Sequence, residues 1–159
     1  MVAPSYRERL RAEGSVLAAC GVVGSVVLLV VRTDDATRGP LSTVVQLAVV
    51  AALLAWLAPR SARTSLAASE AVADEGSGEP TPLWKLPLIV VGLAALFAAL
   101  VGWDAALRIT GGCTLVGLAQ AVVIERIVAA DEERRGRVYF RQPGSRILRG
   151  TKLGFRPRG

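Results

Sequence analysis

Apolar residues fall into four long blocks along the chain, and no charged residue interrupts any of them. The blocks are residues 14–31, 39–59, 86–103 and 109–124. An α-helix needs about 20 apolar residues to cross the hydrocarbon core of a bilayer, which is about 30 Å thick. The pattern therefore predicts four transmembrane helices.

A short polar stretch that carries Asp104 and Arg108 separates the third block from the fourth. One continuous helix over residues 86–124 would be about 58 Å long at ~1.5 Å per residue, roughly twice the thickness of the core. The chain must therefore reverse at this polar stretch. We expect an all-α integral membrane protein with four transmembrane helices in two antiparallel hairpins, followed by a basic cytoplasmic C-terminal tail.

The polar segments between the blocks indicate how the chain is divided. Residues 75–82 read Glu-Gly-Ser-Gly-Glu-Pro-Thr-Pro, which has nothing to bury and predicts a flexible linker between the hairpins. Pro59 is expected to end the second span, and the fourth helix is expected to continue into water to about Arg135. The predicted parts are a cytoplasmic N-terminal segment at 1–13, a first hairpin at 14–58, a cytoplasmic linker at 59–85, a second hairpin at 86–126 and a basic cytoplasmic tail at 127–159.

Composition and charge predict how the helices are oriented across the membrane. Hydrophobic residues make up 52% of the chain and charged residues 20%, so the two kinds must be strongly segregated. The predicted side of the termini has 16 Lys or Arg residues, three in 1–13, three in 59–85 and ten from 126 onward, against three on the other side. Short cytoplasmic segments normally have the excess of Lys and Arg, so both termini are predicted to be cytoplasmic. The preference for alanine and arginine is typical of GC-rich bacterial genomes, and we expect a multi-pass protein of the bacterial inner (plasma) membrane.

The sequence offers little catalytic or redox chemistry. It has no histidine, which removes the usual metal ligand and neutral-pH base, and its two cysteines have no partner at zinc or redox spacing. No charged residue lies near the middle of a span, whereas proton-coupled transporters normally have one. We expect no enzyme, no catalytic residue, no cofactor and no metal site. Cys20 and Cys113 are expected to be free thiols nearer opposite faces of the bilayer, and Glu125 with Arg126 is expected to be a solvated pair.

Small residues at three- and four-residue spacing let helix backbones approach closely, so they indicate packing faces. The first span has Gly21 and Gly24 in such a pattern. In the fourth span Cys113, Gly117 and Ala121 recur every four residues, which predicts the principal packing face of that helix.

Two glutamines, Gln46 and Gln120, are the strongest polar groups inside the predicted spans. An interhelical hydrogen bond is the expected role of each, because an amide in hydrocarbon needs a partner. In the alternative, both line a pathway through the membrane. A packing role requires the glutamines to be shielded between helices, whereas a pathway requires both to face a hydrated cavity.

Residues 136–159 contain no acidic residue, and basic residues are interspersed there with aromatic and aliphatic ones. Such a segment beside a membrane is attracted to anionic lipids by ~1 kcal/mol per charge near the surface, and its apolar residues suit insertion among headgroups. Nucleic acid presents a similar phosphate surface, but no nucleic-acid-binding motif is present, so we do not expect it as a partner. The residues predicted to contact anionic lipid are Arg137, Arg141, Arg146, Arg149, Lys152, Arg156 and Arg158.

Two hypotheses about function follow from these observations. In the first, the chain is a non-enzymatic accessory or interaction subunit, whose small-residue faces pack against a second copy or against a larger membrane protein. In the second, it is a small oligomeric transporter or lipid-handling protein, with Gln46 and Gln120 lining its path.

Overall fold

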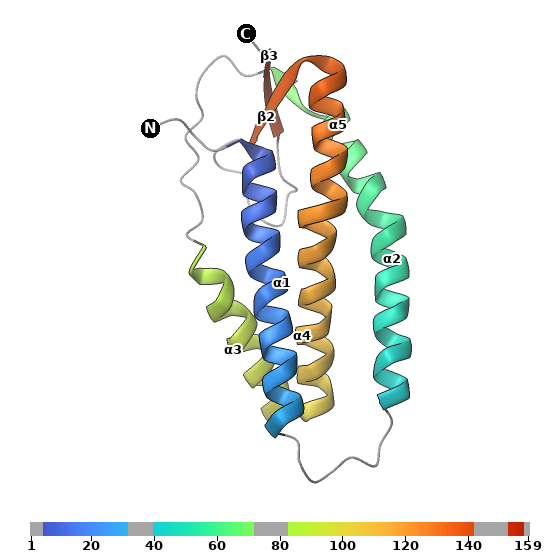
Figure 1. Ribbon diagram of the computed structural model, residues 1–159, viewed down its shortest axis with the longest axis vertical. Helices are drawn as coiled ribbons and strands as arrows, with labels where there is room; N and C mark the ends of the chain where they lie inside the picture. The colour runs from blue at the N-terminus through green and yellow to red at the C-terminus, as the bar shows by residue number, and fades with distance from the viewer. Residues whose placement is uncertain (1–4, 32–39, 72–82, 142–152, 158–159) are drawn as a thin grey trace.

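The computed structural model describes residues 5–31, 40–71, 83–141 and 153–157 (Figure 1). Most of these residues are helical, and successive long helices run in opposite directions. A small sheet lies at one end of the bundle. The elements are α1 (Tyr6–Val31), α2 (Pro40–Ala67), β1 (Glu70–Ala71), α3 (Lys85–Leu100), α4 (Trp103–Leu118), the π-helix η1 (Ala119–Ile124), α5 (Glu125–Arg135), β2 (Arg137–Arg141) and β3 (Leu153–Pro157).

Three helical stretches are long and apolar enough to cross a membrane, namely Tyr6–Val30, Thr43–Ala67 and Trp103–Arg135. The third of these joins α4, η1 and α5 into one rod. Helix α3 has 16 residues, which makes it about 24 Å long and shorter than a hydrocarbon core of about 30 Å. Many valine and leucine side chains point outward from the helices, as expected for a protein surrounded by lipid. The structure thus supports a helical membrane protein with three long apolar helices and a shorter fourth.

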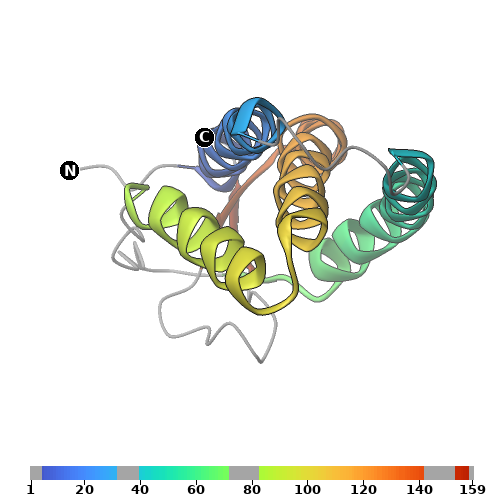
Figure 2. The same ribbon diagram turned by 90° about the horizontal axis from the view of Figure 1, so that it is seen from below.

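Helix α4 lies at the centre of the bundle, with α1 and α3 on one side and α2 on the other (Figure 2). The two predicted hairpins paired α1 with α2, but the main contacts of α1 are with α4. Glycines on α1 let the backbone of α4 come close, whereas α2 meets α4 through larger side chains such as Leu47. Steric fit between surfaces, and not order along the chain, therefore decides which helices pack together.

The reversal between α3 and α4 occurs at Val101 and Gly102, ahead of the charged residues that were expected to form it. Gly102 has φ of 112°, a backbone conformation that residues other than glycine rarely adopt. Asp104 instead lies in the first turn of α4. A carboxylate is favourable there because the N-terminal end of a helix carries partial positive charge.

Pro59 was expected to end the second membrane span, but the helix itself passes through Pro59 and continues to Ala67. Proline removes one backbone hydrogen bond from a helix, so the continuation needs compensation. Ala58, Ala62 and Leu66 recur every four residues and are all buried, which fixes this last part of α2 against the bundle. Packing of this stripe outweighs the local effect of the proline.

The basic C-terminal segment is not simply an extension of the helices, because part of it forms a sheet. Strand β3 pairs in parallel with β1 and antiparallel with β2, giving the order β1-β3-β2. The chain turns back after α5 at Gly136, which adopts the left-handed conformation with φ of 59°. The prediction of an all-α fold is therefore wrong at this end of the molecule.

The principal hydrophobic core lies beneath this sheet. Leu10 of α1, Leu66 of α2 and Val128 of α5 meet Tyr139 and Leu153 of the sheet. We call the part of the molecule formed by the start of α1, the end of α2, α5 and the three strands the capped end. Here the chain buries a core of its own, whereas along the long helices most apolar side chains face outward.

Candidate functional site

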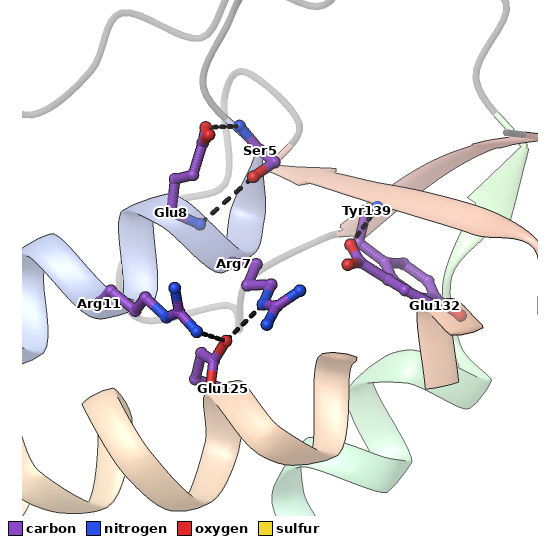
Figure 3. Close-up of polar contacts among 7 residues, drawn as sticks. All are labelled: Ser5, Arg7, Glu8, Arg11, Glu125, Glu132 and Tyr139. Carbon is purple, nitrogen blue, oxygen red and sulfur yellow. Dashed lines mark hydrogen bonds and ion pairs between the residues drawn. The ribbon is translucent and has the colours of Figure 1, made fainter. Parts of the chain in front are cut away.

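A buried carboxylate joins α5 to α1 at the capped end. Glu125 is only 5% exposed, and one of its oxygens, Oε1, accepts hydrogen bonds from two arginines of α1 (Figure 3). The Nε group of Arg7 donates one, and the Nη2 group of Arg11 donates the other over 2.8 Å. The expected solvated pair of Glu125 with Arg126 is therefore wrong. Because α1 packs directly alongside α5, arginines from a distant part of the chain reach Glu125.

The first turn of α1 is fixed by a reciprocal pair of hydrogen bonds. Ser5 Oγ accepts a hydrogen bond from the backbone N–H of Glu8 at 3.3 Å, and Glu8 Oε2 accepts one from the backbone N–H of Ser5 at 3.0 Å (Figure 3). This capping box satisfies backbone donors that the helix leaves unpaired at its start. It holds the turn of α1 that presents Arg7 to Glu125.

Two further acids of α5 hold strand β2. Glu132 Oε1 accepts a hydrogen bond from the backbone N–H of Tyr139 at 3.2 Å (Figure 3), and Asp131 accepts one from the Tyr139 hydroxyl. Burial of the ring and the hydrogen bond to Asp131 raise the pKa of Tyr139. Tyr139 also meets Phe155 of β3 edge to face, with ring centroids 6.4 Å apart. These contacts fasten the sheet to the end of the helical bundle.

A pocket of about 410 Å³ lies between α2 and α5 at the capped end. Its apolar lining comes from Leu66, Ile127 and Ala130. Its polar lining comes from Arg63, Arg134, Arg135 and Asp131. None of these residues was predicted as a site residue, because residues 59–85 were expected to be a linker and nothing in the sequence indicated that this segment packs against α5.

Most of the predicted packing residues of α1 and α4 lie at one close interface. A Cβ atom on Gly21 would lie 2.6 Å from the backbone of Thr110, and one on Gly117 would lie 2.5 Å from the backbone nitrogen of Ala18. Ala121 lies against Gly14, and Gly24 lies against the Thr110 side chain. The hydroxyl of Ser25 also donates a hydrogen bond to Thr110 Oγ1 at 2.9 Å.

Cys113 is half-buried and is not among the side chains that these glycines meet. The face of α4 toward α1 follows Thr110, Thr114, Gly117 and Ala121, so it shares only its last two positions with the predicted stripe. Both cysteines are free thiols. They were expected nearer opposite faces of the bilayer, but they lie at a similar height along the bundle, because Gly21, next to Cys20, packs against residues that flank Cys113.

The two glutamines occupy different surroundings. Gln46 is exposed on the outer surface of α2, and Gln120 is half-buried within η1. Helices α2 and α4 begin at the same end of the bundle and run in the same direction (Figure 1). Gln46 comes six residues after the start of α2, or about 9 Å along it, and Gln120 comes 17 residues after the start of α4, or about 26 Å along that rod. Neither residue lines the pocket between α2 and α5.

An open, mostly apolar groove of about 840 Å³ runs between α1 and α3, with α4 at its base. Small side chains form much of its surface, including Ala19 and Gly24 of α1 and Ala95 of α3. Thr110 is its polar contribution from α4. Neither glutamine lines this groove either.

The predicted lipid-contact residues fall partly outside the described part of the chain, where Arg146, Arg149, Lys152 and Arg158 are found. Arg137 and Arg141 lie on β2 and Arg156 lies on β3. The guanidinium carbon of Arg137 is 4.0 Å from the centre of the Phe155 ring, and that of Arg156 is 5.7 Å from the Phe140 ring. The described arginines of this segment thus belong to a folded sheet, and contact with lipid stays a prediction.

Among residues 5–31, 40–71, 83–141 and 153–157, no three His, Cys, Asp or Glu side chains are grouped so that they could hold a metal ion. No protein-family model, curated protein or solved structure matches this chain. The function of this chain therefore has to be inferred from its own residues. Three features bear on it: the ion pairs of Glu125, the arginine-lined pocket between α2 and α5, and the exposed amide of Gln46 on an apolar helix.

Proposed function

We propose that this chain is a non-enzymatic multi-pass protein of the bacterial inner membrane that acts as an accessory or interaction subunit. It binds a larger membrane protein or a second copy of itself through the surface of α2 that carries Gln46. The capped end serves as the rigid part that orients this surface.

The exposure of Gln46 is the observation that supports this proposal. The side chain stands on an otherwise apolar surface, next to the exposed Val45 and Val49. An amide in hydrocarbon without a hydrogen-bond partner costs free energy, and interhelical amide contacts are a common way to avoid that cost. Since none of the described residues shields Gln46, we assign its expected packing role to a contact with a partner outside the chain.

In this proposal α3 completes four membrane spans despite its length. From Pro40 to Trp56, α2 covers about 24 Å, which is the length of α3. Each stretch has a tryptophan beside a basic side chain at the end that lies toward the sheet (Figure 1). The guanidinium carbon of Arg60 is 3.9 Å from the centre of the Trp56 ring, and Lys85 Nζ is 5.8 Å from the centre of the Trp84 ring. Tryptophan with a basic neighbour is typical of the membrane interface. The excess of Lys and Arg at the capped end supports a cytoplasmic position for that end.

A transport function has less support. A pathway needs both glutamines to face one hydrated cavity. Gln46 is exposed on the outer surface near the start of α2, whereas Gln120 is half-buried midway along the rod of α4, η1 and α5. The groove between α1 and α3 is apolar along most of its surface and includes neither. An interaction surface uses Gln46 where it stands, without a rearrangement of the helices.

The test replaces Gln46 by leucine, with Val49→Leu as the matched control on the same exposed surface. Each variant is purified in mild detergent, its mass is measured by light scattering, and membrane proteins that copurify are identified and quantified. We expect wild type and Val49→Leu to hold one partner in fixed stoichiometry, either a second copy or another membrane protein. Gln46→Leu should lose at least half of it. A monomeric wild type without a stoichiometric partner, or unchanged assembly of Gln46→Leu, would contradict the proposal.

A further inference from the structure

The pocket between α2 and α5 has an excess of positive charge. Three guanidinium groups and one carboxylate line it. The carboxylate of Asp131 is already engaged, because Arg135 Nε lies 3.0 Å from Oδ1 and the Tyr139 hydroxyl donates to Oδ2. Arg63 and Arg134 are exposed, and within the described part of the chain neither has an acidic partner at ion-pair distance. Two cationic groups therefore face the pocket with their donors available.

The position of this pocket relates it to the membrane surface. Arg63 comes seven residues after Trp56, which is about 10 Å farther along α2. Helices α2 and α5 both run toward the capped end, and side chains on a helix lean toward its N-terminal end. We therefore expect the arginines at the pocket to extend toward the apolar helices.

The pocket lining combines cationic and apolar side chains, and a phospholipid headgroup with its glycerol backbone requires both. Guanidinium groups present planar pairs of donors that match phosphate oxygens. Leu66, Ile127 and Ala130 supply an apolar surface for the glycerol and the first carbons of the chains. Basic pockets between helices on the cytoplasmic side of a membrane commonly hold anionic headgroups.

We propose that this pocket binds the phosphate group of an anionic phospholipid from the leaflet beside the capped end, with Arg63 and Arg134 as its principal ligands. A soluble phosphate ester shares the phosphate chemistry. The apolar lining and the closeness of Trp56 favour the lipid as the source. The proposal does not depend on the interaction surface at Gln46, which lies near the other end of α2.

The test uses the full chain in mild detergent and native mass spectrometry, with dioleoyl phosphatidylglycerol as the probe. Arg134→Gln is compared with Arg126→Gln, which removes the same charge from an exposed arginine of the same helix that does not line the pocket. We expect one lipid bound per chain in wild type and in Arg126→Gln, and about tenfold weaker binding in Arg134→Gln. Arg63→Gln makes the same test from α2, should Arg134→Gln fail to fold.

Three results would overturn the proposal. The first is an equal loss of phosphatidylglycerol in Arg134→Gln and Arg126→Gln, which would mean attraction to the general surface charge. The second is equal binding of dioleoyl phosphatidylcholine, which has no net charge. The third is displacement of the lipid by glycerol 3-phosphate at the same concentration, which would identify a site for soluble phosphate esters.

Discussion

At the scale of single residues, Glu125 has the most consequence for the rest of the molecule. It is buried at the first position of α5, and it attracts two arginines from the beginning of the chain. A buried carboxylate is tolerated only when it is paired and hydrogen-bonded, so its arginines are required where they stand. The ion pairs of Glu125 thus fix the position of the first turns of α1 relative to the start of α5.

Replacement of Glu125 by glutamine should lower the apparent melting temperature in detergent by at least about 3 °C. Glutamine keeps the shape and one hydrogen-bond acceptor, but Arg7 and Arg11 lose the negative charge between them. Glu133→Gln is the matched control, because Glu133 is an exposed acid on the same helix. Thermal unfolding followed by circular dichroism makes the comparison. Equal shifts in the two variants would show that the buried pair contributes nothing of its own.

Sequence reasoning could not place Glu125 correctly, because its partners lie more than a hundred residues away. In the sequence Glu125 directly follows an apolar run and is followed by Arg126. A solvent-exposed ion pair between these two neighbours was therefore the expected arrangement. Only the packing of α1 beside α5 brings Arg7 to Glu125. The capping box is different, since Ser5 and Glu8 stand at the required spacing and the signal was readable in the sequence.

At the scale of elements, the pair of α1 and α4 is the central contact of the bundle. Its two surfaces meet through backbone atoms, because glycine stands at the closest positions of both helices. Dispersion contacts over such an interface replace the hydrophobic effect, which does not drive helices together in lipid. Even one added methyl group must therefore matter here.

Gly117→Ala should destabilise the protein by about 1 to 3 kcal/mol, because its Cβ atom would lie 2.5 Å from the backbone nitrogen of Ala18. Gly112→Ala is the matched control, since a Cβ there meets no atom within 4 Å. The control should be neutral or slightly more stable, because alanine favours the helix over glycine. Unfolding in detergent compares the two. If Gly117→Ala were as stable as Gly112→Ala, the close α1–α4 contact would be wrong.

The sequence predicted the elements better than it predicted their partners. The four apolar blocks correspond to α1, α2, α3 and α4 with η1, and the extension of the last helix to Arg135 agrees with the end of α5. The main packing partner of α1 was not predicted, because small residues indicate which face of a helix packs but not which other helix packs against it. The sheet was missed because β1 has two residues and β3 pairs with it from a distant part of the chain.

At the scale of the whole molecule, charge is distributed unevenly between the two ends. Among the described residues, the start of α1, the end of α2 and the region from α5 onward hold most of the arginines. Arg108 lies near the other end, at the start of α4. This asymmetry is the basis for the predicted orientation, with the capped end in the cytoplasm.

Single cysteines at Glu70 and Val101 test that orientation, in a chain whose own two cysteines are replaced by alanine. Both positions are exposed, Glu70 in the sheet and Val101 at the reversal between α3 and α4. A membrane-impermeant maleimide added to spheroplasts should label Val101→Cys at once. It should label Glu70→Cys only after the membrane is permeabilised. The opposite pattern would place the capped end outside the cell.

The order of the strands affects how the protein is made. Strand β3 lies between β1 and β2, and it is the last of the described elements to leave the ribosome. Helix α1 likewise has to wait in the membrane until α4 has been translated, because α4 is its main partner. Until then α1 lacks the helix that it packs against. A chain that stops before Leu153 leaves the buried ring of Tyr139 without its neighbouring strand. The sheet at the capped end can therefore close only after residues 153–157 have been translated.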